Sequence, residues 1–85
     1  MAIDQIFGAL DDPTRRGILH LLARRERAAG ELLERFPLSQ PALSKHLRVL
    51  REAGLVRVRR EGTRRVYSVN REGLESVREW LDRLR

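Results

Sequence analysis

The chain is 85 residues long, with 41% hydrophobic and 35% charged residues and a formal net charge of +6. This length and composition favour one folded domain over residues 1–85 and exclude a disordered tail. It contains no cysteine, which excludes disulfides, thiolate nucleophiles and cysteine metal sites. Because no apolar run approaches the roughly 18 to 20 residues of a membrane span, and the N-terminus lacks the layout of a secretory signal, we expect a cytoplasmic protein without membrane contact.

The first part of the chain predicts three short helices. Apolar residues at positions 3, 6, 7 and 10 predict a helix over residues 3–10 with one apolar stripe. Asp12 suits an N-cap and Pro13 suits the first position of a second helix, which should end near Arg25. Residues 29–36 predict a third helix, which the proline that follows cannot continue.

The fourth predicted helix has both a start and a stop signal. Ser39 suits the N-cap, the helix runs to about Ala53, and Gly54 suits a left-handed C-terminal cap. At 100° per residue, the leucines of this helix fall on one side and its polar and basic residues on the other. We therefore expect one buried face and one exposed, basic face.

A hairpin and a last helix complete the chain. Valine and arginine alternate over residues 56–59, residues 61–63 form a turn, and residues 65–69 return as a second strand. Asn70 can cap a final helix over residues 71–85, whose apolar residues recur at the spacing of helices that pair. The predicted fold class is mainly α with a small β-hairpin, a winged helix-turn-helix of five helices plus a two-stranded wing.

The positive charge is concentrated in residues 39–67. This segment holds eight basic and two acidic residues, and eight minus two accounts for the whole net charge of +6, whereas the other 56 residues hold ten of each sign. A local basic surface suits a phosphate backbone. Four arginines around Gly62 would repel one another without an anionic partner, which favours phosphate or minor-groove contact over a solvated tip.

Three segments carry a resemblance to a known family. Residues 9–16 (ALDDPTRR), 38–47 (LSQPALSKHL) and 50–56 (LREAGLV) resemble the arsenical-resistance repressor (ArsR-type) family, and the similarity extends over nearly the whole chain. The resemblance implies a prokaryotic, homodimeric winged helix-turn-helix repressor that binds double-stranded DNA. It also implies that Gln40, Ser44, Lys45 and His46 face the major groove, that the hairpin is the wing, and that the helices over residues 3–10 and 71–85 form the dimer interface.

Together with the helical angles, the resemblance gives three sets of candidate residues. The recognition-helix set is Ser39, Gln40, Pro41, Ser44, Lys45, His46 and Arg48. The wing set is Arg59, Arg60, Thr63, Arg64 and Arg65. The dimer-interface set is Ile3, Ile6, Phe7, Leu10, Leu74, Val77, Trp80, Leu81 and Leu84.

The chain differs from the metal-sensing members of that family. Where those members carry a cysteine pair, this chain has Ala28 and Gly30 ahead of Glu31, and residues 71–85 contain carboxylates but no histidine. A transition-metal site normally needs thiolate or imidazole donors. We therefore expect no metal site, no cofactor and no metal response, as in the branch without metal-sensing cysteines and histidines. No sequence feature points to a particular inducer or co-ligand.

Four other residues have two competing interpretations each. His20 lies opposite the apolar side of the second helix, which favours a solvated histidine over a ligand or a base. His46 lies at the edge of the buried side of the fourth helix, which favours an orienting hydrogen bond over base contact. Arg15 and Arg16 oppose the helix dipole, which indicates either an external phosphate or carboxylate, or a pair with a neighbouring aspartate.

The predicted function is a sequence-specific, double-stranded DNA-binding transcriptional regulator, most simply a homodimeric repressor on an inverted-repeat operator. The alternative is a sequence-tolerant architectural nucleic-acid-binding protein, which the shortage of aromatic residues for base stacking disfavours. An enzyme is disfavoured because the chain has no cysteine, two separated histidines, no glycine-rich phosphate loop and no clustered carboxylate pair.

Overall fold

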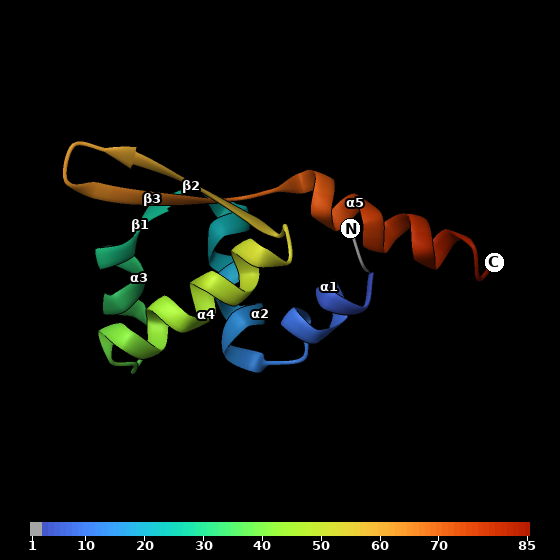
Figure 1. Ribbon diagram of the computed structural model, residues 1–85, viewed down its shortest axis with the longest axis horizontal. Helices are drawn as coiled ribbons and strands as arrows, with labels where there is room; N and C mark the ends of the chain where they lie inside the picture. The colour runs from blue at the N-terminus through green and yellow to red at the C-terminus, as the bar shows by residue number, and fades with distance from the viewer. Residues whose placement is uncertain (1–2) are drawn as a thin grey trace.

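The computed structural model describes residues 3–85, which form five helices and three strands (Figure 1). In chain order the elements are α1 (Ile3–Leu10), α2 (Pro13–Arg24), β1 (Arg27–Ala28), α3 (Ala29–Arg35), α4 (Gln40–Glu52), β2 (Val56–Glu61), β3 (Arg64–Val69) and α5 (Arg71–Asp82). The five predicted helices and both strands of the hairpin are confirmed, and their ends differ from the predicted ends by no more than three residues.

The predicted two-stranded wing is present as β2 and β3, and β1 adds a third strand that was not predicted. The order is β1-β3-β2 and both pairings are antiparallel, with Arg27 opposite Tyr67 and Ala28 opposite Val66. A strand of two residues is too short for an alternating pattern to reveal it. It ties the wing to the segment between α2 and α3, so the middle of β3 is held by the body of the protein.

The core lies between the helices and the sheet. Its largest fully buried side chains come from four helices and from the turn after α4: Ile6, Ile18, Leu32, Leu50 and Leu55. Gly54 has a φ of 77° at the end of α4, which confirms the predicted left-handed cap. Gly62 has a φ of 63° in the turn of the wing, where a side chain would be strained.

The junction between the hairpin and α5 differs from the prediction. Asn70 occupies the N-cap position of α5, but its side chain forms no capping hydrogen bond. Instead its Nδ2 donates to the Gly54 carbonyl oxygen at 2.8 Å, and its Oδ1 accepts from the Arg57 Nε at 3.2 Å. The side chain therefore ties the start of α5 to the turn after α4.

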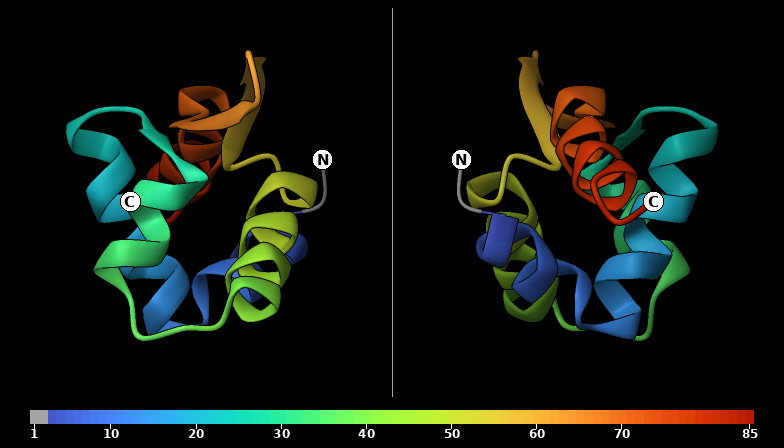
Figure 2. Two further views of the ribbon diagram at one scale, coloured as in Figure 1. Left: turned by 90° about the vertical axis from the view of Figure 1, so that its left-hand side faces the viewer. Right: turned by 90° about the vertical axis from the view of Figure 1, so that its right-hand side faces the viewer.

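The molecule is elongated, with extents of 43 × 23 × 20 Å. The tip of the wing and the C-terminal end of α5 lie at opposite ends of the long axis, and α1 lies beside α5 (Figure 1). Seen from the wing tip, α3 and α4 stand on either side below the hairpin (Figure 2, left). No helix within residues 3–85 has the length and apolar character needed to cross a membrane.

Candidate nucleic-acid interface

Helix α4 presents a polar face to solvent. The Ser39 Oγ accepts a hydrogen bond from the Ala42 N at 3.2 Å, which fixes the start of the helix. Leu43, Leu47 and Leu50 are buried. The exposed residues include six of the seven in the predicted recognition-helix set: Ser39, Gln40, Pro41, Ser44, Lys45 and Arg48. These side chains are therefore free to meet a ligand along the length of the helix.

His46, the seventh member of the set, has a different environment. Its side chain is 21% exposed, and its Nδ1 lies 3.2 Å from the Arg15 Nη1 and 4.0 Å from the Asp12 Oδ2. A guanidinium can only donate, so the Nδ1 accepts this hydrogen bond. The geometry matches the predicted orienting hydrogen bond, and it directs the ring toward the start of α2.

Arg15 and Arg16 do not form the side-chain pair with a neighbouring aspartate that was one of their two interpretations. The Arg15 Nε donates to the Ala9 carbonyl oxygen at 2.7 Å, and the Arg16 Nη1 donates to the Leu10 carbonyl oxygen at 2.8 Å. The last carbonyl groups of a helix have no partner within the helix and carry partial negative charge. The C-terminal end of α1 is therefore the partner that offsets the unfavourable position of these cations.

Asp12 completes this arrangement. Its Oδ2 accepts a hydrogen bond from the Arg15 N at 3.0 Å, as predicted for an N-cap. That hydrogen bond, together with the charge of Arg15, lowers the pKa of the Asp12 carboxyl below its ordinary value.

The wing arginines are not the unpartnered cluster that the sequence predicts. Arg59 forms a two-pronged pair with the carboxylate of Glu26, and its Nη2 also lies 2.9 Å from the Glu61 Oε2. These hydrogen bonds raise the pKa of Arg59 and lower the pKa of Glu26. The Arg64 Nη2 lies 3.7 Å from the Glu31 Oε1. Two of the four wing arginines are thus held by carboxylates next to β1.

The other two wing arginines form no ion pair among residues 3–85. Arg60 and Arg65 are directly opposite each other across β2 and β3, and alternation places them on the same face as Tyr67. Like charges in directly opposite positions repel. This pair therefore leaves a strongly positive surface on the face of the hairpin that turns toward α4.

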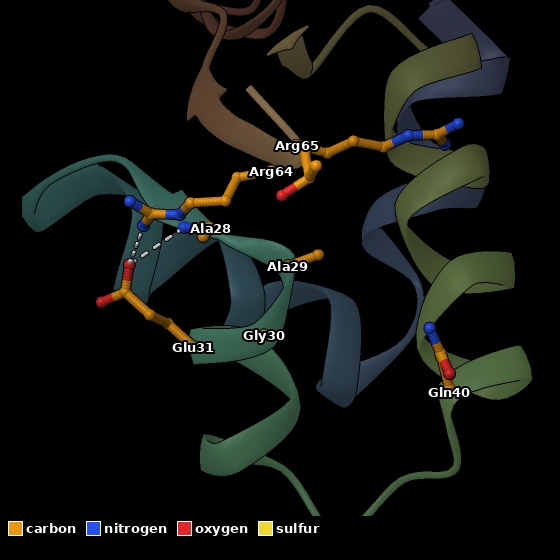
Figure 3. Close-up of a pocket in the computed structure, with 8 residues that line it drawn as sticks. Ala28, Ala29, Gly30, Glu31, Gln40, Arg64 and Arg65 are labelled. Atoms are coloured by element: carbon orange, nitrogen blue, oxygen red, sulfur yellow. Dashed lines mark hydrogen bonds and ion pairs between the residues drawn. The ribbon is translucent and has the colours of Figure 1, made fainter. Parts of the chain in front are cut away.

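A groove separates the wing from the two helices of the helix-turn-helix unit. It has a volume of about 480 Å³ and is lined by Ala28, Ala29, Gly30, Glu31, Gln40, Thr63, Arg64 and Arg65. Figure 3 shows Arg64 directed at Glu31 and Arg65 directed at α4. A second hollow continues it along α4, between Arg65, Ser44 and Arg48. The exposed face of α4 and the free face of the wing thus border one basic groove.

The predicted interface set lies on α1, on α5 and, for Leu84, in the turn that follows α5. The Phe7 and Trp80 rings meet edge to face, with centroids 5.1 Å apart and an interplanar angle of 76°. Leu81 and Leu84 are 53% and 66% exposed, which is unusual for large apolar side chains. Ile6 is 0% exposed, so its inclusion in the interface set is wrong: it belongs to the protein's own core.

Among the described residues, no three histidine, aspartate or glutamate side chains lie close enough together to hold a metal ion. His20 is exposed on α2, and His46 is engaged by Arg15. The groove between α4 and the wing therefore offers cations and hydrogen-bond donors rather than metal ligands.

A short helix, a turn, an exposed polar helix and a basic two-stranded wing define a winged helix-turn-helix DNA-binding protein. Residues 12–58 match the model of the family described as "Bacterial regulatory protein, arsR family". The chain belongs to this family of transcriptional regulators.

Named relatives and a solved structure agree with this assignment. The chain is 49% identical over 80 residues to the HTH-type transcriptional regulator Rv2034 of Mycobacterium tuberculosis, covering 94% of this chain and 75% of that protein. It is 40% identical over 80 residues to the arsenical resistance operon repressor of Staphylococcus xylosus, covering 94% and 77%. The crystal structure of the ArsR family transcriptional regulator RHA00566 is similar to it with a TM-score of 0.90 and 33% identity, covering 96% and 84%. The protein is thus a DNA-binding transcriptional regulator and not an enzyme.

Proposed function

We propose that the protein is a homodimeric repressor that binds an inverted-repeat operator in double-stranded DNA without responding to metal ions. The observation that carries this proposal is the shared basic groove between the exposed face of α4 and the free face of the wing. A helix in the major groove and a basic arm beside it use this arrangement to contact base edges and phosphates together.

The residues divide into three roles. Gln40 and Ser44 contact base edges from the exposed side of α4, because their short polar side chains can donate and accept hydrogen bonds. Lys45 and Arg48 contact phosphates from the same helix, and Arg60 and Arg65 contact the backbone or the minor groove from the wing. His46 orients α4 rather than contacting a base, since its Nδ1 is occupied by Arg15.

The dimer interface is the surface formed by α1 and α5. Its residues are Ile3, Phe7, Leu10, Leu74, Val77, Trp80, Leu81 and Leu84. The exposure of Leu81 and Leu84 at the end of the molecule opposite the wing supports this role, since a second copy can cover them without blocking the DNA-binding groove. A twofold axis through this surface would place the two α4 helices about one turn of DNA apart, ~34 Å.

Metal independence follows from the available donors. The Staphylococcus xylosus relative is named for arsenical resistance, but this chain has no cysteine. Its two histidines lie on different elements, and within residues 3–85 neither has a second nitrogen or sulfur donor from which a transition-metal site could be built. The signal that releases this repressor from DNA is therefore of a different kind.

The test is selection of duplexes by the purified protein from a random pool, at near-physiological salt and with no metal added. An enriched inverted repeat, with a dimer in sedimentation, is expected. Adding Zn²⁺, Cd²⁺ or arsenite should leave binding to the selected duplex unchanged. Salt-sensitive binding with no enriched sequence would instead identify the architectural alternative, and release by any of these ions would overturn the metal-independent part of the proposal.

A further inference from the structure

We propose that Arg15 is a positioning residue that fixes the recognition helix α4 relative to α1, and so sets the separation of half-sites that the dimer accepts. This inference rests on the proposed function, because a half-site separation has meaning only for a protein that binds two half-sites. Arg15 does not need to touch DNA for this role. It acts through His46 on one side and through the end of α1 on the other.

The Arg15 guanidinium joins three elements of the fold. From α2, its Nε donates to the Ala9 carbonyl oxygen at 2.7 Å and its Nη2 donates to the Gly8 carbonyl oxygen at 3.2 Å. Its Nη1 lies 3.2 Å from the Nδ1 of His46 on α4. All three nitrogens of one planar group are therefore engaged, two with α1 and one with α4.

The chemistry of this position requires arginine. A guanidinium presents its donors in a rigid plane, so its three nitrogens can hold acceptors that lie in different directions. A lysine ammonium is a single centre on a flexible stem, and it could neutralise the end of α1 without also reaching His46. The hydrogen bond from the Arg15 N to the Asp12 Oδ2 fixes the backbone from which the side chain starts.

The two elements joined by Arg15 have different tasks in the proposed dimer. Helix α1 carries Phe7, whose ring packs on Trp80 of α5 in the surface assigned to the dimer interface. Helix α4 carries the side chains assigned to DNA contact. The orientation of α4 relative to α1 therefore determines how far apart the two copies of α4 lie. One base pair more or less between half-sites displaces a half-site by ~3.4 Å and turns it by ~35°, so a fixed orientation should select one spacer length.

Arg16 provides a matched control. Its Nη1 donates to the Leu10 carbonyl oxygen at 2.8 Å, so it also neutralises the end of α1. It has no hydrogen bond to α4 among the described residues. Arg16→Ala should therefore remove a cation and one hydrogen bond from the same helix end, and leave the link to the recognition helix intact.

The experiment measures affinity for duplexes that carry the selected half-sites with the natural spacer and with spacers one and two base pairs longer or shorter. The proteins are the wild type, Arg15→Ala, Arg15→Lys, His46→Ala, His46→Asn and Arg16→Ala, each shown to be folded by circular dichroism at the assay temperature. The readout is the ratio of affinities for the natural and altered spacers. A general loss of stability lowers all affinities together and does not change this ratio.

The wild type and Arg16→Ala should discriminate strongly between spacers. Arg15→Ala, Arg15→Lys and His46→Ala should reduce the ratio by about tenfold or more, the effect of losing one charge-assisted hydrogen bond. In His46→Asn the Oδ1 can take the place of the Nδ1 as acceptor, so this variant should recover much of the ratio.

Four results would count against the inference in different ways. An unchanged ratio in folded Arg15→Ala overturns it, and so does an equal loss in Arg16→Ala, which would show that only the end of α1 matters. If Arg15→Ala does not fold, an unchanged ratio in His46→Ala overturns it, since that variant removes the same link without touching α1. A wild type that binds no paired half-sites overturns the proposed function first, and the inference with it.

Discussion

Replacing Gly73 by alanine should destabilise the protein, although alanine is the better helix former. Gly73 lies in the first turn of α5 and is buried. A Cβ at this position would lie 2.1 Å from the Gly54 carbonyl oxygen and 2.9 Å from the Gly54 carbonyl carbon. Ordinary contact begins near 3.4 Å, so the shortfall is 3.4 minus 2.1, or 1.3 Å. Both obstructing atoms belong to the backbone, so no side chain can turn aside to relieve the overlap.

The expected magnitude follows from three contributions. Overpacking of this kind costs ~1 to 3 kcal/mol. If α5 moves away, the hydrogen bond from the Asn70 Nδ2 to the Gly54 carbonyl oxygen is weakened, which costs a further ~0.5 to 1.5 kcal/mol. Alanine in a helix offsets at most ~1 kcal/mol. The net loss should be ~1 to 3 kcal/mol, or a fall in Tm of about 5 to 20 °C for a chain of this size.

The assay is thermal and urea unfolding at a fixed protein concentration, because the Tm of a dimer depends on concentration. Gly8→Ala is the matched control: Gly8 also lies in a helix, but a Cβ there would meet nothing within 4 Å. It should raise the Tm by a few degrees. Replacement by alanine should therefore lower the Tm at Gly73 and raise it at Gly8. A Gly73→Ala protein as stable as the wild type would refute the close approach of α5 to the turn after α4.

Three further predictions concern the charged surface. Lys45→Ala and Arg48→Ala should each weaken binding to every duplex and reduce the slope of log affinity against log salt by about 1, measured in a salt series; unchanged slopes would remove both residues from the phosphate contacts. Glu26→Gln should leave Arg59 paired with Glu61 alone among the described residues, so that wing amides exchange hydrogen faster while affinity for non-specific DNA rises; unaltered exchange would show that the pair with Glu26 does not hold the wing. The hydrogen bond from the Ala28 N lowers the pKa of the Glu31 carboxyl from 4.5, so the ionised carboxylate stabilises the fold above pH 4.5 and this stabilisation is lost as the pH falls through the lower pKa of the folded state. The Tm difference between the wild type and Glu31→Gln should therefore shrink over that pH range. A constant Tm difference would contradict the predicted direction of the pKa shift.

The fold could be predicted where local chemistry determines a helix end. Asp12 and Ser39 cap α2 and α4 through their own side chains, and Gly54 adopts the left-handed conformation that ends α4. Each of these signals acts within a few residues of chain. Asn70 also has a capping side chain, but partners distant in sequence take both of its polar atoms. The capping rule therefore failed at Asn70, because tertiary hydrogen bonds engage the same side-chain atoms that a cap would use.

The candidate site could be predicted only in part, for the same reason. The exposed face of α4 follows from the period of a helix, so a list of polar residues was enough to find it. The ion pairs of Arg59 and Arg64 could not be found by counting charges in residues 39–67, since their partners Glu26 and Glu31 lie outside that segment. These glutamates come close to the wing only because β1 joins the sheet. The role of Arg15 was equally hidden, because two of its three partners are backbone carbonyls.

The two faces of the wing have different tasks, and strand alternation separates them. On one face, Arg57 pairs with a carboxylate of α5, while Arg59 and Arg64 pair with carboxylates beside β1. On the other face, Arg60 and Arg65 form no ion pair among residues 3–85, and neither do Lys45, Arg48 and Arg51 on α4. Of the eight basic residues in residues 39–67, three form ion pairs that tie the wing to its surroundings, and the other five form none among residues 3–85 and are the ones assigned to phosphates in the proposed function. Because the free cations have no internal partner to abandon, DNA binding costs no ion pair of the fold, and their removal should weaken binding without loosening the wing that presents them.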